Sequence, residues 1–164
     1  MNDRAVDDRS RDDHETSILG AMTTPRFEPA LETQADVEEA WSELMGPWSF
    51  GGHSVWMMLI EGDRPLPQLT EVTETEDAPD AVLTERMAQI LSLIDLQVAP
   101  GVRVAFLRSR PGVDKITDVD RAWATCLYAA ARRASVPCEV VHLATRGSVC
   151  PIPADVVGLR TAPP

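Results

Sequence analysis

The chain carries a histidine and three cysteines in its last third that could do chemistry if folding brought them together: Cys126, Cys138, His142 and Cys150. Cys138 and His142 fall on one face of an expected strand, and Cys126 lies on the apolar face of an expected helix. Their spacing matches no known metal-ligand pattern, and isolated cysteines commonly pack as small apolar residues. We therefore predict no metal site and no cofactor, and assign the cysteines no role.

A thiol nucleophile is a separate alternative, with Cys150 as the attacking group and His142 as its base. Cys150 precedes Pro151 and is the cysteine expected to be most exposed. No aspartate or asparagine is placed to orient His142, so an enzyme built on this pair ranks below the other hypotheses.

Two arginines, Arg108 and Arg110, follow an apolar run and precede a helix that Thr117 is expected to cap. Two guanidinium groups and a threonine near a helix N-terminus suit a phosphate or a carboxylate ligand. The same arginines could instead pair with Asp118 or Asp120 and so tie the loop to the helix. Ion pairing is favoured over anion binding, because ion pairs of this kind are common in proteins.

Composition places the chain among single-domain globular proteins. It has 164 residues, 44% of them hydrophobic and 25% charged, and a formal net charge of −11. The negative charge argues against binding nucleic acid or an anionic membrane surface. No apolar run is long enough to span a bilayer and the N-terminus is highly charged, so we expect neither signal peptide nor anchor, and a cytoplasmic location.

Three helices are predicted from apolar spacing and capping residues. The first begins at Thr33 and Asp36 and stops at Gly46; the third runs from Asp118 to Ala134. The second is expected to be capped by Asp77, with Pro79 in its first turn. Its expected core-facing stripe consists of Leu83, Met87, Ile90, Leu91 and Ile94.

Four strands are predicted, at Ser54–Ile60, Leu66–Val72, Val102–Arg108 and Cys138–Ala144, with a short final strand after Gly147. Pro65 and Pro67 put the second strand at a sheet edge. The order α-β-β-α-β-α-β predicts an α/β (α+β) fold with a mixed sheet flanked by helices. Residues 1–30 are expected to form a disordered acidic and polar tail, residues 31–160 a single domain, and residues 161–164 a flexible C-terminus.

This order, with residues inside it, resembles the RadC type of JAB/MPN domain, a zinc metallohydrolase superfamily with a cytidine-deaminase-like architecture. In that family a Glu-His pair precedes the first strand, the third strand ends in H-x-H-P-S-G, and P-S-x-x-D opens a long helix. Here Gly52-His53 precedes a strand, RSRPG (108–112) ends another, and ITDVD (116–120) opens the long helix. Val141-His142 stands where the family has D-H. The resemblance spans residues 33–159, with one residue fewer in the loop.

The family's chemistry needs two histidines and an aspartate on Zn²⁺ and a glutamate as general base. Carried over by position, the glutamate falls on Gly52, the histidines fall on Arg108 and Arg110, and the aspartate is retained as Asp120. Glycine supplies no base, and arginine has no lone pair to offer a cation. These pseudo-active-site positions predict that the chain is not a zinc hydrolase. His142 matches a structural histidine of the family, expected to be satisfied by hydrogen bonds.

The resemblance thus implies a pseudoenzyme of bacterial type that acts through protein–protein contact, with an unknown partner or as a homodimer. Trp48 and Phe50, in the segment GPWSFGG, are the residues we expect at such an interface. The alternative is a sensor of an anionic metabolite or nucleotide at Arg108, Arg110 and Asp120. A sensor requires an open positive pocket there, whereas a scaffold requires a closed, ion-paired cluster.

Overall fold

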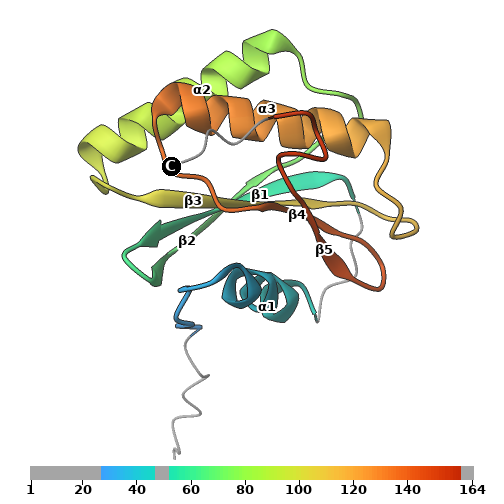
Figure 1. Cartoon of the computed structure of the whole chain (residues 1–164), viewed down its shortest axis with the longest axis horizontal. Coiled ribbons are helices and arrows are strands. Elements are labelled where there is room, and N and C mark those ends of the chain that lie inside the picture. The colour runs from blue at the N-terminus through green and yellow to red at the C-terminus, as the bar shows by residue number, and fades with distance from the viewer. Residues whose placement is uncertain (1–26, 47–51, 160–164) are drawn as a thin grey trace, which may run out of the picture.

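The computed structural model describes residues 27–46 and 52–159. Within these ranges a five-stranded mixed sheet lies between two layers of helix (Figure 1). Helices α2 (Ala81–Gln97) and α3 (Asp118–Ala134) cover one face, and α1 (Gln34–Met45) crosses the other. The predicted class, a mixed sheet flanked by helices, is confirmed. The predicted interface residues Trp48 and Phe50 lie outside the described residues, as do residues 1–26 of the predicted tail and the last residues, 160–164.

The sheet has the spatial order β2-β1-β3-β4-β5. Strand β1 (Ser54–Glu61) pairs antiparallel with both β2 (Arg64–Val72) and β3 (Arg103–Ser109). Strand β3 is parallel to β4 (Val141–Ala144), and the connection between them is α3, as parallel pairs require. Strand β5 (Val149–Ile152) returns antiparallel to β4. The proline-containing β2 is an edge strand, as predicted.

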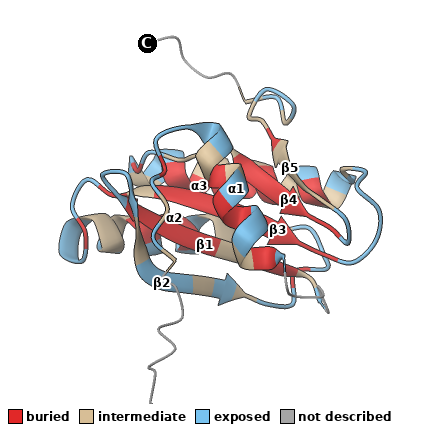
Figure 2. Ribbon diagram, turned by 90° about the horizontal axis from the view of Figure 1, so that it is seen from below, coloured by how far each residue is buried: buried red, intermediate tan, exposed pale blue. Residues whose placement is uncertain are grey.

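Alternation along the central strands divides the core in two. In β3, Val104 and Phe106 point into the cluster under α2 and α3, whereas Ala105 and Leu107 point into the cluster under α1. The central strands are therefore buried on both faces, while much of β2 is exposed (Figure 2). The position of a β3 residue in this alternation decides which helical layer its side chain meets.

Both capping-box helices begin where the sequence predicts. Thr33 caps α1 through Asp36, and Thr117 caps α3 through Asp120. The predicted start of α2 is wrong: Asp80 caps it, by accepting a hydrogen bond from the Leu83 amide at 2.7 Å. Pro79 precedes the helix, and the Asp77 carbonyl accepts a hydrogen bond from Trp123 Nε1.

Two other predictions need correction. Ile90 was placed on the buried stripe of α2 but is 46% exposed. The strand predicted from Cys138 begins only at Val141, and Cys138 itself forms an isolated bridge with Val104. Phe27, before α1, packs against the cluster of buried residues under α1.

Candidate functional site

The two arginines reach α3 because of their place in the β3 alternation. Arg108 follows Val104 and Phe106 on the face that α2 and α3 cover, and Arg110 repeats that position just past the strand end. Ser109 points the other way, where its Oγ accepts a hydrogen bond from Trp56 Nε1 at 3.0 Å. The predicted positions Arg108, Arg110 and Asp120 thus come together, and we call them the Arg–Asp–Arg cluster.

Asp120 is the centre of this cluster. It lies in the first turn of α3 and is 0% exposed. Its Oδ1 accepts a hydrogen bond from Arg108 Nε at 2.7 Å, and Arg110 donates to its Oδ2 from Nη2 at 2.9 Å and from Nε at 3.0 Å. The amide and hydroxyl of Thr117 each donate to Oδ2 at 2.8 Å. Of the two aspartates expected as partners, Asp118 and Asp120, both arginines pair with Asp120, and its carboxylate is engaged on both oxygens.

Arg108 is held by further contacts deep in the core. Its side chain is 1% exposed, and its Nη1 donates to Thr75 Oγ1 at 3.0 Å. Its guanidinium carbon lies 5.7 Å from the centre of the Trp123 ring, within the range of a cation–π interaction. Thr75 comes from the segment between β2 and α2, so Arg108 joins that segment to the first turns of α3.

Arg110 organises the loop between β3 and α3. Its Nη1 donates to the carbonyls of Pro111 at 3.1 Å and Val113 at 3.2 Å, and its Nη2 donates to the carbonyl of Lys115 at 2.7 Å. Gly112 fits this turn for two reasons: its φ is +106°, and an added Cβ would lie 3.2 Å from Arg110 Nη1. The loop is wrapped around the guanidinium.

The charges in the cluster are unequal, with two guanidinium groups around one carboxylate. Burial alone raises the pKa of Asp120, but the hydrogen bonds from Arg110, Thr117 and Arg108 outweigh it and lower that pKa from 3.8 to about 2. Burial lowers the pKa of Arg108, and Asp120 opposes this shift. Asp120 is therefore ionised at neutral pH, and the backbone carbonyls and the Trp123 ring help to disperse the excess positive charge.

This arrangement offers little to a ligand. Each nitrogen of the Arg110 guanidinium already donates to an acceptor within the protein, and its side chain is only 8% exposed. The Thr117 hydroxyl is used by Asp120. Gly52, at the position equated with the general base, is exposed and a Cβ there would meet nothing within 4 Å. The cluster is the closed, ion-paired form rather than an open positive pocket.

The cysteines and His142 do not form a site. Among the described residues, no group of three or more His, Cys, Asp or Glu side chains could hold a metal ion. Burial raises the pKa of Cys138 to about 12, and it also raises the pKa of Cys126 and Cys150. Thiols with raised pKa values are poor nucleophiles at neutral pH.

His142 is buried without the hydrogen bonds expected of it. It is 0% exposed, and neither ring nitrogen has a hydrogen-bond partner within the described part of the chain. The Glu38 carboxylate lies 3.9 Å from its Nε2. Burial lowers the pKa of His142, opposed by the charge of Glu38, so the ring is neutral at pH 7.

Three participants in the cluster were missed from the sequence. Thr75 and the Trp123 ring come from segments that nothing in the local pattern links to the arginines, and nothing in the loop marks the carbonyl of Lys115, five residues after Arg110, as an acceptor. Only the proline-glycine pair after Arg110 signals a tight loop there.

No protein-family model matches the chain, and no match is found among curated proteins or solved structures. None of the helices in residues 27–46 and 52–159 is long and apolar enough to cross a membrane.

Proposed function

We propose that this chain is a catalytically inactive JAB/MPN-like domain of the RadC type that acts in the cytoplasm by binding another protein. The observation that carries the proposal is the Arg–Asp–Arg cluster. At the positions that the resemblance equates with zinc ligands, two permanent cations surround the one carboxylate. The guanidinium groups have no lone pair to offer a metal ion, and both oxygens of the Asp120 carboxylate already accept hydrogen bonds from the arginines.

The geometry also explains why a protein would retain such a cluster without catalysis. In a zinc site the metal ties the strand end, the loop and the helix together. Here Arg108 and Arg110 come from the end of β3, and both bind Asp120 on α3. Arg110 holds the loop carbonyls between them. The guanidinium groups thereby take over the structural part of the metal's role.

A binding role is supported by an apolar surface on α2. Ile90, Leu93 and Leu96 are 46%, 53% and 74% exposed on the outer side of this helix. Exposed aliphatic side chains that adjoin one another on one helix face are typical of protein contact surfaces. Because the Arg–Asp–Arg cluster is closed and the outer face of α2 is apolar and exposed, protein contact is the function that the chain's surface supports best.

The equivalence with the zinc site can be tested by rebuilding it. We expect the variant Gly52→Glu/Arg108→His/Arg110→His to retain one zinc ion per chain after gel filtration, because two imidazoles would then flank Asp120. Zinc content is measured by elemental analysis, and circular dichroism checks folding. The matched control adds Asp120→Asn and should lose the metal. A folded triple variant without bound zinc would show that the equated positions are not equivalent.

The binding role is tested by affinity capture with purified, tagged chain in the native host extract. The comparison variant is Leu93→Arg, and the control is Glu39→Arg, which places the same side chain at an exposed position of α1. We expect at least one specific protein, the chain itself included, to be retained by the unmodified chain and by the control but not by Leu93→Arg. Each candidate is then purified and its binding measured directly. If no protein binds the unmodified chain, the proposed function is contradicted.

A further inference from the structure

The outer face of α2 has a symmetric pattern. Leu93 stands at its centre; Ile90 and Leu96 lie three residues before and after it, and Gln89 and Gln97 lie four residues before and after it. All five side chains are exposed. Because residues three and four apart share one face of a helix, these five form a continuous surface, which we call the Leu93 face.

The order of residues on this face is the same when read in either direction: amide, aliphatic, Leu93, aliphatic, amide. When two identical helices pack antiparallel about a two-fold axis, a residue that comes n positions before the axis in one helix lies beside the residue that comes n positions after the axis in the other. An axis through Leu93 puts Leu93 against its own copy, Ile90 level with Leu96 of the second copy, and Gln89 level with Gln97. Such self-complementarity is what an isologous interface between two copies requires.

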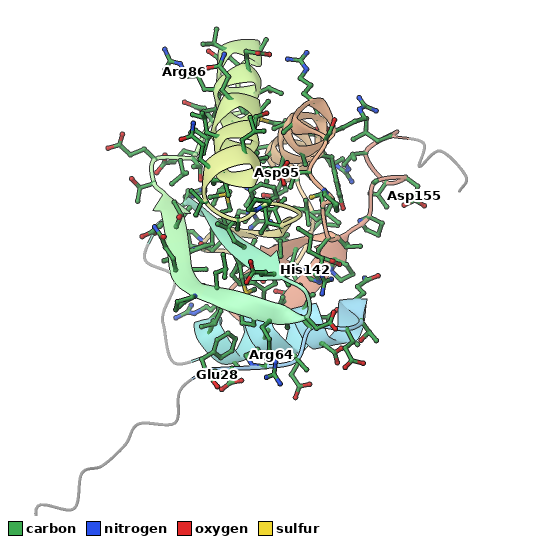
Figure 3. The ribbon with its side chains drawn as sticks, turned by 90° about the vertical axis from the view of Figure 1, so that its left-hand side faces the viewer. Glu28, Arg64, Arg86, Asp95, His142 and Asp155 are labelled. Carbon is green, nitrogen blue, oxygen red and sulfur yellow. The ribbon has the colours of Figure 1, made fainter. Side chains whose placement is uncertain are left out.

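Charge permits the same occupant at this face. The chain has a formal net charge of −11, so most orientations of two copies repel each other. The Leu93 face carries no ionisable side chain. Asp95, on the same helix, accepts a hydrogen bond from the Gly101 amide at 2.9 Å, and Glu85 pairs with Arg133. Arg86 and Asp95 are labelled on α2 in Figure 3, and in the sequence Arg86 comes three residues, about one helical turn, before Gln89. This face lets two acidic chains meet without opposing carboxylates.

We propose that the Leu93 face is a homodimer interface, in which α2 packs antiparallel against α2 of a second copy. This inference rests on the proposed function, because it names the protein that the chain binds. The aliphatic side chains at Ile90, Leu93 and Leu96 form the centre of the interface, and the glutamine amides form its polar rim. The face presents only five side chains from each copy, so we expect a weak dimer that dissociates at about micromolar concentrations.

The first test is sedimentation equilibrium on the full chain across the micromolar range. We expect a monomer–dimer equilibrium that Leu93→Arg weakens by roughly a hundredfold or more, because each added guanidinium would face its own copy at the axis. Glu39→Arg, which lies on α1 and outside the Leu93 face, should not weaken the dimer. Circular dichroism establishes that both variants fold, which their exposed positions favour. A chain that stays monomeric at every concentration overturns the inference, as does a dimer that Leu93→Arg leaves intact.

The second test fixes the direction of the helices. In the antiparallel arrangement, Leu93→Cys forms a disulfide-linked dimer under mild oxidation, because the two Cα atoms approach at the axis. Val82→Cys is the control: it is 55% exposed on the same helix, and its copy lies about 33 Å away along the antiparallel pair. Cross-linking at both positions indicates parallel helices and overturns the arrangement. A monomeric chain that still binds a different protein through Leu93 overturns only the inference, and the proposed function stands.

Discussion

Removal of the Asp120 carboxylate should destabilise the fold far more than removal of a neighbouring carboxylate. Asp120→Ala leaves two guanidinium groups buried without their shared acceptor, because Arg108 and Arg110 are 1% and 8% exposed. Breaking a buried ion pair by deleting one partner costs about 3–5 kcal/mol. A domain of this size has a total stability of about 5–15 kcal/mol, so the variant should fold but lie near its limit.

Asp120→Asn separates the charge from the side-chain shape. The pKa of Asp120 falls from 3.8 to about 2 in the folded chain, which corresponds to about 2 kcal/mol of stabilisation that only the ionised form provides. We therefore expect Asp120→Asn to lose about 2 kcal/mol and Asp120→Ala to lose more. Asp118→Ala is the matched control, because Asp118 lies in the same helical turn but is fully exposed, where solvent screens its pair with Arg121.

The assay is urea unfolding followed by circular dichroism at neutral pH, with stability taken from the midpoint and slope. Arg108→Ala and the double variant Arg108→Ala/Asp120→Ala complete a thermodynamic cycle. We expect the double variant to lose less than the sum of the single variants by at least about 1 kcal/mol, because the two side chains contact each other. The reasoning is refuted if Asp120→Ala and Asp118→Ala have equal stability, or if the cycle shows no coupling.

Two further predictions concern the same cluster. The folded-state pKa of Asp120 lies below its unfolded value, so the contribution of its ionised carboxylate to the free energy of unfolding is complete above about pH 4 and is lost as the pH falls through about 2. Urea midpoints measured between pH 5 and pH 2 should therefore fall more steeply for the unmodified chain than for Asp120→Asn. Parallel curves for the two proteins would contradict this prediction. Thr117→Ala should lose about 1–2 kcal/mol, because the hydroxyl both caps α3 and donates to Asp120. Thr117→Ser, measured by the same unfolding assay, should restore most of that loss, and an unchanged deficit would assign the effect to the methyl group.

Local patterns predicted the elements well where the signal is local. The capping boxes at Thr33 and Thr117 fixed the starts of α1 and α3, because a capping side chain and its backbone partner lie within one turn. The start of α2 was wrong because Asp77 and Asp80 are both plausible caps by type, and the fold uses the Asp77 carbonyl for Trp123 instead. Ile90 was misplaced because apolar spacing alone does not show which part of a wide stripe meets the core.

The sequence alone determined which chemical groups are present: at the positions equated with zinc ligands it has arginines, which are cations that cannot bind a metal, and at the position equated with a general base it has a glycine. It also indicated that Arg108 or Arg110 would pair with an aspartate at the start of the following helix. Tertiary structure decided that both arginines bind Asp120 rather than Asp118, because β3 alternation aims them at the layer that holds α3 and the first turn of α3 buries only one of its two aspartates. It also decided that the cluster is closed, because Thr75 arrives from a segment 33 residues away in the sequence and the loop after Arg110 folds back so that its carbonyls accept hydrogen bonds from that guanidinium.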